Sequence, residues 1–208
     1  MCFAAKWHGE KKVEFRSDFH DGHEAMILRA RELYDEADAI ITYNGKGFDN
    51  KHLRREWLMA GIGPDAGPAD IDLWTVVARN FKFASNKLDH VCQQLGLGSK
   101  VKHSGFELWP ACIAGDPQAW KQFQKYCCHD VVLTDALYPV LRPFIKSHPH
   151  RGLFGGPRAG CPRCESMHVI GRGYRVTTTG RYARLQCIDC RGYFTGTHRV
   201  EAVHHKAA

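Results

Sequence analysis

Four cysteines near the C-terminal end of the chain have the spacing of a metal site. They form two C-x-x-C pairs, Cys161 with Cys164 and Cys187 with Cys190, and 22 residues separate the pairs. A two-residue gap lets one tight turn present both thiolates, and two such turns supply the four tetrahedral ligands that zinc binds at about 2.3 Å. Because cysteine fills all four positions, none is open for catalysis, and we expect a structural Zn²⁺. Two redox-active pairs are the alternative, but the sequence offers no supporting fold for them.

A second set of residues has oxygen atoms suited to hard metal ions. Asn44 and Asp49 follow a short apolar run, and Tyr126 and Asp130 are four residues apart in a helical pattern, so that they share one helical face. Hydrolysis of a phosphodiester by two metals needs clustered carboxylates, which hold two Mg²⁺ or Mn²⁺ ions about 3.5–4 Å apart. A tyrosine hydroxyl can orient the attacking water. Taken singly, Asp49 suits a helix N-cap equally well, and Tyr126 and Asp130 suit an ordinary helix surface.

Together these residues resemble two motifs of the DEDD 3′–5′ exonucleases. Asn44-x-x-x-Phe48-Asp49 is similar to the second motif, and Tyr126-x-x-x-Asp130 is similar to the third motif in its tyrosine variant. The histidine variant would need a histidine at position 125, which is lysine. The resemblance covers roughly residues 2–145 and is nearest to phage-type exonucleases that also carry a C-terminal zinc ribbon.

The resemblance implies a ribonuclease-H-like α/β fold and a role for each matching residue. Asp49 and Asp130 would be ligands of the catalytic Mg²⁺ or Mn²⁺, and Tyr126 would orient the attacking water. Asn44 would shape the site near the substrate. Lys87 most simply begins a helix, although it could also meet the substrate.

The first motif of that family, Asp-x-Glu on the central strand of its sheet, is absent. No aspartate in the chain is followed two positions later by glutamate, and the nearest approach, Asp21-Gly22-His23-Glu24, has the wrong spacing. The neighbours of a missing central strand would keep unpaired backbone groups, at about 1–3 kcal/mol for each buried one. Three explanations stay open: the natural product begins upstream of Met1, a second polypeptide supplies the strand, or the protein binds nucleic acid without cutting it. We therefore expect weak or no metal-dependent nuclease activity from these residues alone.

Alternating strand and helix patterns must position these side chains. Periodicity and breakers predict an α/β domain over residues 1–146, a linker over 147–160, and a zinc ribbon with a basic tail over 161–208. A β-hairpin is expected between the cysteine pairs, in Val169–Leu185. The other expected strands are Cys2–Trp7, Lys12–Arg16, Ala39–Tyr43, which reads as buried, and Ile71–Trp74. The expected helices are Glu24–Ala37, Phe48–Ala60, Thr75–Asn80, Asn86–Leu95, and one from Pro117, capped by Asp116, to Pro139.

The net charge of +7 is concentrated in the last part of the chain. From Lys146 onward there are eleven lysines and arginines but three acids, so the preceding part is nearly neutral. A basic small module predicts contact with a polyanion, and we expect nucleic acid, DNA in preference to RNA. General solubility is the simpler explanation of the same charge. The arginines expected to grip phosphates are Arg172, Arg175, Arg181 and Arg184.

Composition also bears on location and partners. The chain has 44% apolar and 25% charged residues, an odd number of cysteines, and neither a signal peptide pattern nor a run long enough to span a bilayer. We expect a cytoplasmic protein, in the host cytoplasm if a phage encodes it, with no membrane partner. Three functions stay open: an exonuclease acting from a 3′ end, a non-catalytic nucleic-acid-binding protein, and an adaptor that binds a protein partner through the ribbon.

Overall fold

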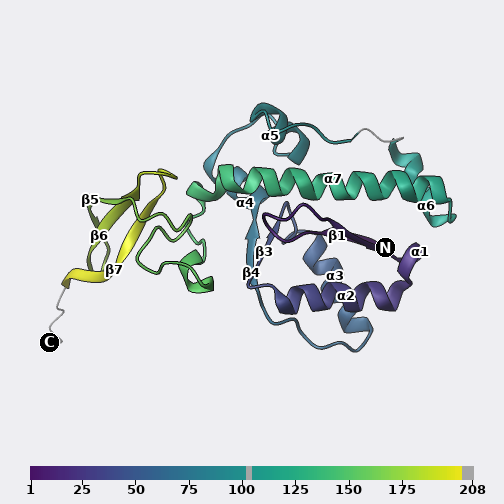
Figure 1. Cartoon of the computed structure of the whole chain (residues 1–208), viewed down its shortest axis with the longest axis horizontal. Coiled ribbons are helices and arrows are strands. Elements are labelled where there is room, and N and C mark those ends of the chain that lie inside the picture. The colour runs from purple at the N-terminus through teal and green to yellow at the C-terminus, as the bar shows by residue number, and fades with distance from the viewer. Residues whose placement is uncertain (102–104, 203–208) are drawn as a thin grey trace. The chain divides into compact units, whose positions relative to one another are not determined.

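The computed structural model describes residues 1–101 and 105–202 (Figure 1). Contacts divide the chain into a first unit, Met1–Leu141, and a second unit, Arg142–Ala208, each of which is described by itself. The first unit contains β1 (Cys2–Ala5), β2 (Glu14–Ser17), α1 (Asp18–Asp21), α2 (His23–Glu36), β3 (Ala39–Thr42), α3 (Asp49–Met59), β4 (Ala69–Asp72), α4 (Leu73–Asn80), α5 (Leu88–Gln94), the 3-10 turn η1 (Gly105–Glu107), α6 (Leu108–Ile113) and α7 (Pro117–Leu141).

The strands of the first unit form two separate pairs. β1 pairs antiparallel with β2, from Cys2 opposite Ser17 to Ala5 opposite Glu14. β3 pairs parallel with β4, with Ile41 opposite Ile71. Among the described strands, β1 and β3 have no ladder between them. The predicted hairpin at the N-terminus and the mixed α/β class are therefore confirmed.

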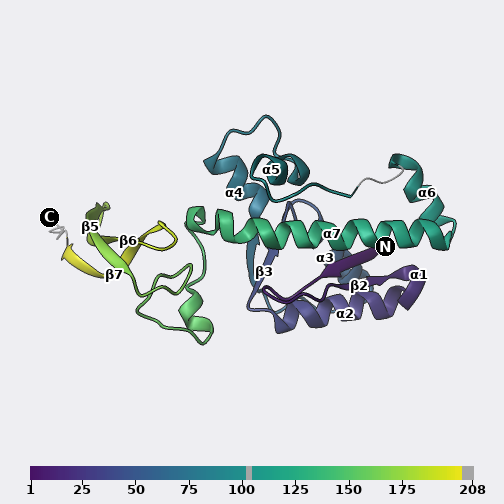
Figure 2. The same cartoon turned by 45° about the horizontal axis from the view of Figure 1, so that its top comes forward.

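The long helix α7 contacts β1, β2 and β3, and it runs past the N-terminal strands in both views (Figure 1, Figure 2). It begins as predicted, because the Asp116 carboxylate accepts the Gln118 N–H at 2.8 Å and Pro117 takes the first helical position, where no N–H is needed. The helix was expected to end at Pro139, but it continues to Leu141. Pro139 has no N–H and so leaves one helical hydrogen bond unmade. Leu141 is 2% exposed, and the burial of its side chain favours the additional half-turn despite that loss.

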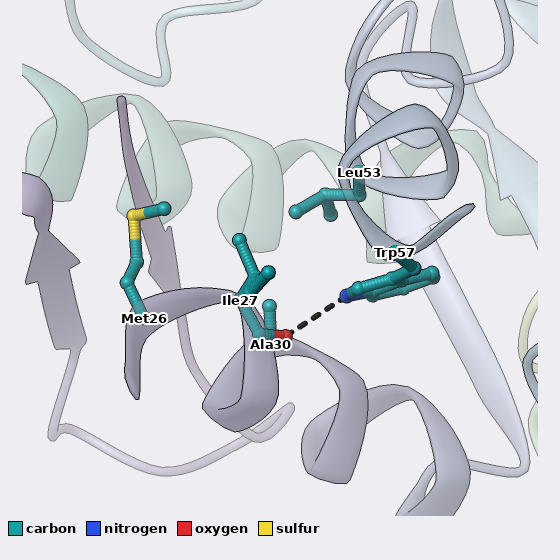
Figure 3. Close-up of a cluster of buried hydrophobic side chains, with 5 residues drawn as sticks. All are labelled: Met26, Ile27, Ala30, Leu53 and Trp57. Atoms are coloured by element: carbon teal, nitrogen blue, oxygen red, sulfur yellow. Dashed lines mark hydrogen bonds between the residues drawn. The ribbon is translucent and has the colours of Figure 1, made fainter. Parts of the chain in front are cut away.

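Two apolar clusters hold the helices in place. In the first, α2 packs on α3 and the Trp57 indole N–H donates to the Ile27 carbonyl at 2.9 Å (Figure 3). Its buried members are Met26, Ile27, Ala30, Leu53 and Trp57. In the second, α6 packs on the start of α7, and the Trp120 indole N–H donates to the Cys112 carbonyl at 2.9 Å. Its buried members are Leu108, Cys112, Ala119, Trp120 and Phe123.

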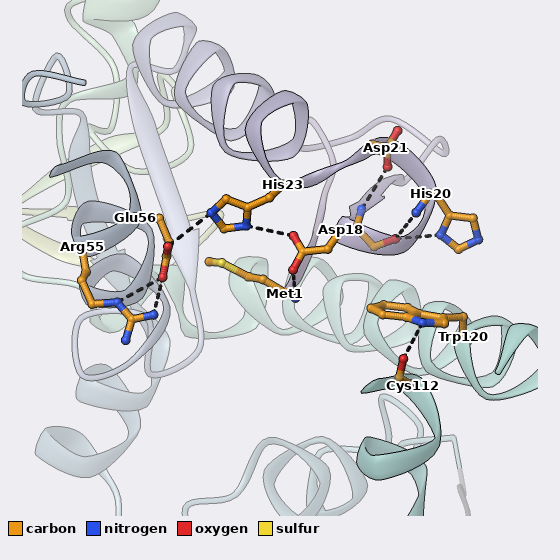
Figure 4. A network of polar contacts seen from close by, with 10 residues as sticks. Met1, Asp18, His20, Asp21, His23, Arg55, Glu56, Cys112 and Trp120 are labelled. Carbon is orange, nitrogen blue, oxygen red and sulfur yellow. Dashed lines mark hydrogen bonds and ion pairs between the residues drawn. The ribbon is translucent and has the colours of Figure 1, made fainter. Parts of the chain in front are cut away.

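A chain of polar contacts ties the start of β1 to α2 and α3 (Figure 4). The Met1 ammonium pairs with Asp18, and the Asp18 N–H donates to the Met1 carbonyl at 3.0 Å. His23 then joins Asp18, at 3.1 Å, to Glu56, at 3.3 Å. The N-terminal strand is thus anchored on its β2 side.

Two strand predictions need correction. The run Ala39–Tyr43 was expected to be buried, yet every residue of β3 is only half-buried, as is every residue of β1. Among the described strands, each of these two has a partner on one edge only, so no strand covers the other edge. The strand expected over Ile71–Trp74 ends at Asp72, and α4 begins at Leu73 instead of Thr75, because the Asp72 side chain caps that helix.

The second unit is built around a three-stranded antiparallel sheet. It comprises η2 (Arg142–Phe144), η3 (Arg151–Phe154), β5 (Val169–Val176), β6 (Gly180–Cys187) and β7 (Tyr193–Ala202), in the sheet order β5-β6-β7. The predicted hairpin between the cysteine pairs is β5 with β6. The expected linker, residues 147–160, lies within this unit: it contains η3, and the Arg151 N–H donates to the Pro162 carbonyl at 2.8 Å. Across residues 1–101 and 105–202, no helix combines the length and apolar character needed to cross a membrane.

Candidate functional site

The predicted catalytic residues meet at one large cavity of the first unit. This cavity has a volume of about 1670 Å³ and is lined by β1, β3 and the middle of α7. Its lining includes every residue that the sequence analysis assigned to the nuclease site: Asn44, Asp49, Lys87, Tyr126 and Asp130. These residues come from segments far apart in the chain, so the fold alone brings them together.

A tight turn after β3 positions Asn44 and Asp49. Asn44 has a positive φ of 69°, which asparagine tolerates better than most residues. A Cβ on Gly45 would lie 2.4 Å from the Thr42 hydroxyl oxygen, so the close approach of this turn to β3 requires glycine. The turn delivers Asp49 to the first residue of α3. The N-cap position of that helix is Phe48, and no described side chain caps it, so Asp49 does not act as an N-cap.

Asp72 fastens this turn to the start of α4. Its Oδ1 accepts the N–H groups of Trp74 at 3.0 Å and Thr75 at 3.4 Å, the cap of α4. The same carboxylate accepts the N–H of Asn44 at 2.9 Å and, through Oδ2, that of Lys46 at 3.2 Å. Asp72 is 4% exposed, so this pairing satisfies a buried charge. The sequence placed Asp72 in the strand after the second motif but gave it no role in the site, because the two turn N–H groups that donate to it, those of Asn44 and Lys46, lie 28 and 26 residues earlier in the chain.

Asp49 is exposed because it faces the cavity, which is open to solvent. Protein atoms nevertheless surround the cavity and partly dehydrate the carboxyl group, and this desolvation raises the pKa of Asp49. A carboxyl group with a raised pKa is held less firmly in its charged form and gains from a neighbouring cation.

Lys100 bridges the two α7 residues of the site. Its ammonium donates to the Tyr126 hydroxyl at 2.9 Å and to Asp130 Oδ2 at 2.5 Å, and it lies 4.9 Å from the centre of the Tyr126 ring. Burial disfavours its charge, but these two hydrogen bonds raise the pKa of Lys100, so it stays cationic. The Lys100 N–H donates to Asp89 at 2.6 Å, which holds the lysine in place. Sequence reasoning missed Lys100, because a lysine after a glycine-rich turn carries no distinctive signal.

The carboxylates of this cavity do not by themselves make a metal cage. Within residues 1–101 and 105–202, the sole cluster of three or more metal-ligand side chains is the cysteine group of the second unit. Asp49 and Asp130 provide two carboxylates, and the Lys100 ammonium already neutralises Asp130. The residues present therefore do not fit the expected pair of Mg²⁺ or Mn²⁺ ions, and this result agrees with the absence of Asp-x-Glu.

The four cysteines do fit a metal. Their sulfur atoms all lie within 4.8 Å of one another, with 3.7 Å between Cys161 and Cys190 and 3.6 Å between Cys164 and Cys187. A zinc tetrahedron with bonds of about 2.3 Å has edges of about 3.8 Å, which these separations approach. Burial opposes ionisation of Cys187, but backbone N–H groups of Cys190 and Asp189 lower the pKa of Cys187 to about 7.

A buried arginine supplies further support for an anionic centre. Arg163 lies within the first cysteine pair and is 5% exposed. Its Nε donates to the Ile145 carbonyl at 3.0 Å, while one terminal nitrogen, Nη1, has no hydrogen-bond partner among the described residues. A Cβ on Gly192 would lie 2.5 Å from that nitrogen and 3.3 Å from the Cys190 sulfur, so the two atoms are neighbours. Four thiolates around a divalent ion carry two net negative charges, and the guanidinium would offset one of them.

The sheet separates the four predicted arginines. All four are exposed, but Arg181 stacks on Tyr174 at 3.9 Å and pairs with Glu201 at 3.4 Å. Arg175 stands opposite Tyr182 in the ladder, which places its side chain on the other face of the sheet, because neighbouring strand residues point to opposite sides. On that second face, hydrogen bonds join Arg172 to Gln186 and Arg184 to the Arg172 carbonyl, and Arg199 pairs with Tyr182 in the ladder and lies 6.0 Å from its ring. We call this the arginine face; it contains Arg172, Arg175, Tyr182, Arg184, Gln186 and Arg199.

A family model for the RNase H superfamily matches residues 2–142. This stretch contains both motif segments and the whole cavity lining after Met1, and it stops before the cysteine pairs. No curated protein matches the sequence. Because the matched residues make up more than half of the chain, and because the strands, α7 and the cavity lie within them, the chain belongs to the RNase H superfamily.

Proposed function

We propose that the first unit is a 3′–5′ exonuclease domain of the DEDD type. Membership of the RNase H superfamily supports a nuclease in general, acting on nucleic acid. The observation that carries the finer proposal is that Asp49, Tyr126 and Asp130 face the same cavity. Asp49 and Asp130 would bind cations that the scissile phosphate also contacts, and the Tyr126 hydroxyl would orient water.

The residues described here supply only part of that site, and this limits the activity we expect. Two carboxylates cannot enclose two divalent ions, which prefer six or more oxygen ligands. The Lys100 ammonium provides one positive charge beside Asp130 and Tyr126, and it can contact a phosphate oxygen. The chain alone is therefore expected to bind a strand end and to hydrolyse it slowly or not at all.

A 5′-labelled single strand of DNA, with an RNA of the same sequence, tests this function in Mn²⁺ or Mg²⁺. We expect any cleavage to shorten the strand from its 3′ end and to disappear in Asp49→Asn and Asp130→Asn. Asp38→Asn, an exposed acid just before β3, is the matched control and should cleave normally. Shortening from the 5′ end, or cleavage that survives both substitutions, would contradict the proposal. Rapid 3′ digestion by the chain alone would contradict our inference that Asp49 and Asp130 are too few carboxylates to hold two catalytic metal ions.

For the second unit we propose a zinc ribbon whose arginine face binds nucleic acid. The four sulfur atoms would hold a structural Zn²⁺, and the arginine face would contact phosphates while Tyr182 stacks on bases. A non-catalytic nucleic-acid-binding protein is the second candidate function. It is favoured by Lys100, because an ion pair with Asp130 keeps that carboxylate from a metal.

The two sides of the sheet provide a matched test of nucleic-acid binding. Arg175→Gln and Arg184→Gln remove charge from the arginine face, whereas Arg181→Gln removes the same charge from the face where Glu201 already compensates it. Each lost phosphate contact should lower the slope of log K against log salt by about 0.7 for a single strand. We expect this change in the first two variants only. Equal effects in all three, or none, would contradict the arginine face; absence of any binding would favour a protein partner instead.

A further inference from the structure

Two cysteines from distant parts of the first unit, Cys2 and Cys127, lie on the same wall of its cavity. Cys2 is the first residue of β1 and Cys127 lies within α7, and these two elements contact each other. Both side chains pack against the second apolar cluster. Both are half-buried free thiols that line the solvent-open cavity, so small solutes can reach them.

A hydrogen bond between the two thiol groups gives them different chemical characters. The Cys127 S–H donates to the Cys2 sulfur, and this bond lowers the pKa of Cys2 although partial burial opposes it. The same bond raises the pKa of Cys127, which therefore keeps its proton. The pair thus consists of a cysteine that ionises readily and a protonated neighbour. A reactive cysteine with a second cysteine beside it is the arrangement found at sites of reversible thiol oxidation.

The other cysteines of the first unit lack this character. Cys92 is fully buried, and burial raises its pKa to about 11. Burial also raises the pKa of Cys112, which is 6% exposed. The pKa of Cys128 is raised for the same reason, and its side chain points about 100° around the helix from that of Cys127. Cys2 is therefore the thiol of this unit that is most open to oxidation.

We propose that Cys2 and Cys127 form a redox modification site, in which a peroxide converts the two neighbouring thiols into a disulfide between β1 and α7. The Cys2 thiolate attacks one peroxide oxygen, the O–O bond breaks, and Cys2 becomes a sulfenic acid as hydroxide leaves. The Cys127 sulfur then attacks the Cys2 sulfur, the S–O bond breaks, and the sulfenic oxygen leaves as water. Overall, two thiols are oxidised to one disulfide, and one hydrogen peroxide is reduced to two water molecules.

The disulfide cross-links two elements of the cavity wall. All four residues of β1 line the cavity, and Cys127 directly follows Tyr126 in α7. A bond between positions 2 and 127 closes most of the first unit into one loop, which restricts the unfolded chain and makes the oxidised unit harder to unfold. Where thiols are otherwise kept reduced, such a bond is transient. None of these steps needs nucleic acid or a divalent metal, so the site is independent of the proposed nuclease reaction.

Peptide mapping of the full chain tests the site directly. The chain is treated with hydrogen peroxide in a buffer that contains zinc, its remaining thiols are blocked, and tryptic peptides are separated without reduction. We expect the peptide that ends at Lys6 to be linked to the peptide Tyr126–Lys146. Fragmentation should place the bond at Cys127, and dithiothreitol should reverse it. A bond from Cys2 to any other cysteine, a dimer on a non-reducing gel, or oxidation without this bond overturns the proposal.

Single substitutions separate the roles of the two sulfur atoms. In Cys127→Ser, oxidised Cys2 has no partner, so dimedone should trap its sulfenic acid. In Cys2→Ser, dimedone should label Cys127 several-fold less, because that thiol keeps its proton. Cys128→Ser is the matched control on the same helix and should still form the disulfide. Equal labelling in the first two variants, or loss of the disulfide in the control, overturns the proposal. If a variant does not fold, the peptide map of the unmodified chain decides.

Unfolding in urea provides a second measurement. Tryptophan fluorescence should show a higher unfolding midpoint after oxidation of the unmodified chain and of Cys128→Ser, and dithiothreitol should restore the lower value. Oxidation should leave the midpoints of Cys2→Ser and Cys127→Ser unchanged. A midpoint that does not rise although the disulfide has formed contradicts a cross-link between the folded positions of β1 and α7. A rise of the same size in Cys2→Ser assigns the effect to other cysteines and overturns the proposal.

Discussion

Asp72→Ala should destabilise the first unit and loosen the turn that carries Asn44 and Asp49. Four backbone N–H groups would lose their acceptor: two at the start of α4 and two in the turn. The carboxylate is buried, so no other described side chain replaces it without movement of the backbone. Stability and the geometry of the candidate site therefore depend on the same residue.

The magnitude follows from these contacts. Loss of a helix N-cap costs about 1 kcal/mol. A hydrogen bond to a charged acceptor contributes about 1.5–3 kcal/mol, but Asn44 and Lys46 are exposed, and water partly replaces their lost partner, so we count roughly 1 kcal/mol for each. The free energy of unfolding should fall by about 2–4 kcal/mol. Asp72→Asn retains one acceptor oxygen and should lose about half of this.

Tryptophan fluorescence during urea unfolding measures this change in the first unit alone, because all five tryptophans lie in residues 1–141. Asp38→Ala is the control, since this exposed acid next to β3 should change the free energy of unfolding by less than about 0.5 kcal/mol. Equal unfolding midpoints for Asp72→Ala and Asp38→Ala would refute the stabilising role of the hydrogen bonds that Asp72 accepts from the turn.

Three further predictions concern the Lys100–Asp130 ion pair, the loss of stability at low pH through Asp89, and the cysteine metal site. A double-mutant cycle of Lys100→Met and Asp130→Asn should show a coupling of about 1–2 kcal/mol in urea unfolding, because both groups are partly buried; additive effects would contradict the bridge. The backbone N–H of Lys100 lowers the pKa of Asp89, so the stability it provides is present above the ordinary value of about 3.9 and is lost as pH falls through the lower folded value. Asp89→Asn should therefore flatten the fall in unfolding free energy below about pH 4, and an unchanged slope would contradict the contact. Elemental analysis should find about one zinc per chain, and Cys164→Ser or a strong chelator should release it with loss of sheet signal in circular dichroism; an intact sheet without metal would contradict a structural site.

Most of the features that could be predicted from the sequence follow from the spacing of residues close together in the chain. Two residues between the cysteines of each pair put both sulfur atoms on one turn, and the i, i+4 spacing of Tyr126 and Asp130 puts both on one face of α7. The hairpin β5–β6 and the cap at Asp116 followed from the same kind of short-range pattern. β7 was not predicted, because most of its side chains are exposed and it lacks the apolar alternation that marks a half-buried strand.

The sequence by itself determined the residue types and the short-range geometry: four thiolates in two turns, and two motif segments that resemble an exonuclease without its Asp-x-Glu strand. Only the tertiary structure decided which distant segments meet. It placed Asp49 and Asp130 on one cavity, brought the Lys100 ammonium to Tyr126 and Asp130, and made Asp72 the hydrogen-bond acceptor that joins the turn to α4. Among the described strands, β1 and β3 each keep one edge without a strand partner. The physical reason is that these contacts join residues far apart in the chain through packing and buried hydrogen bonds, which no local pattern of residues specifies.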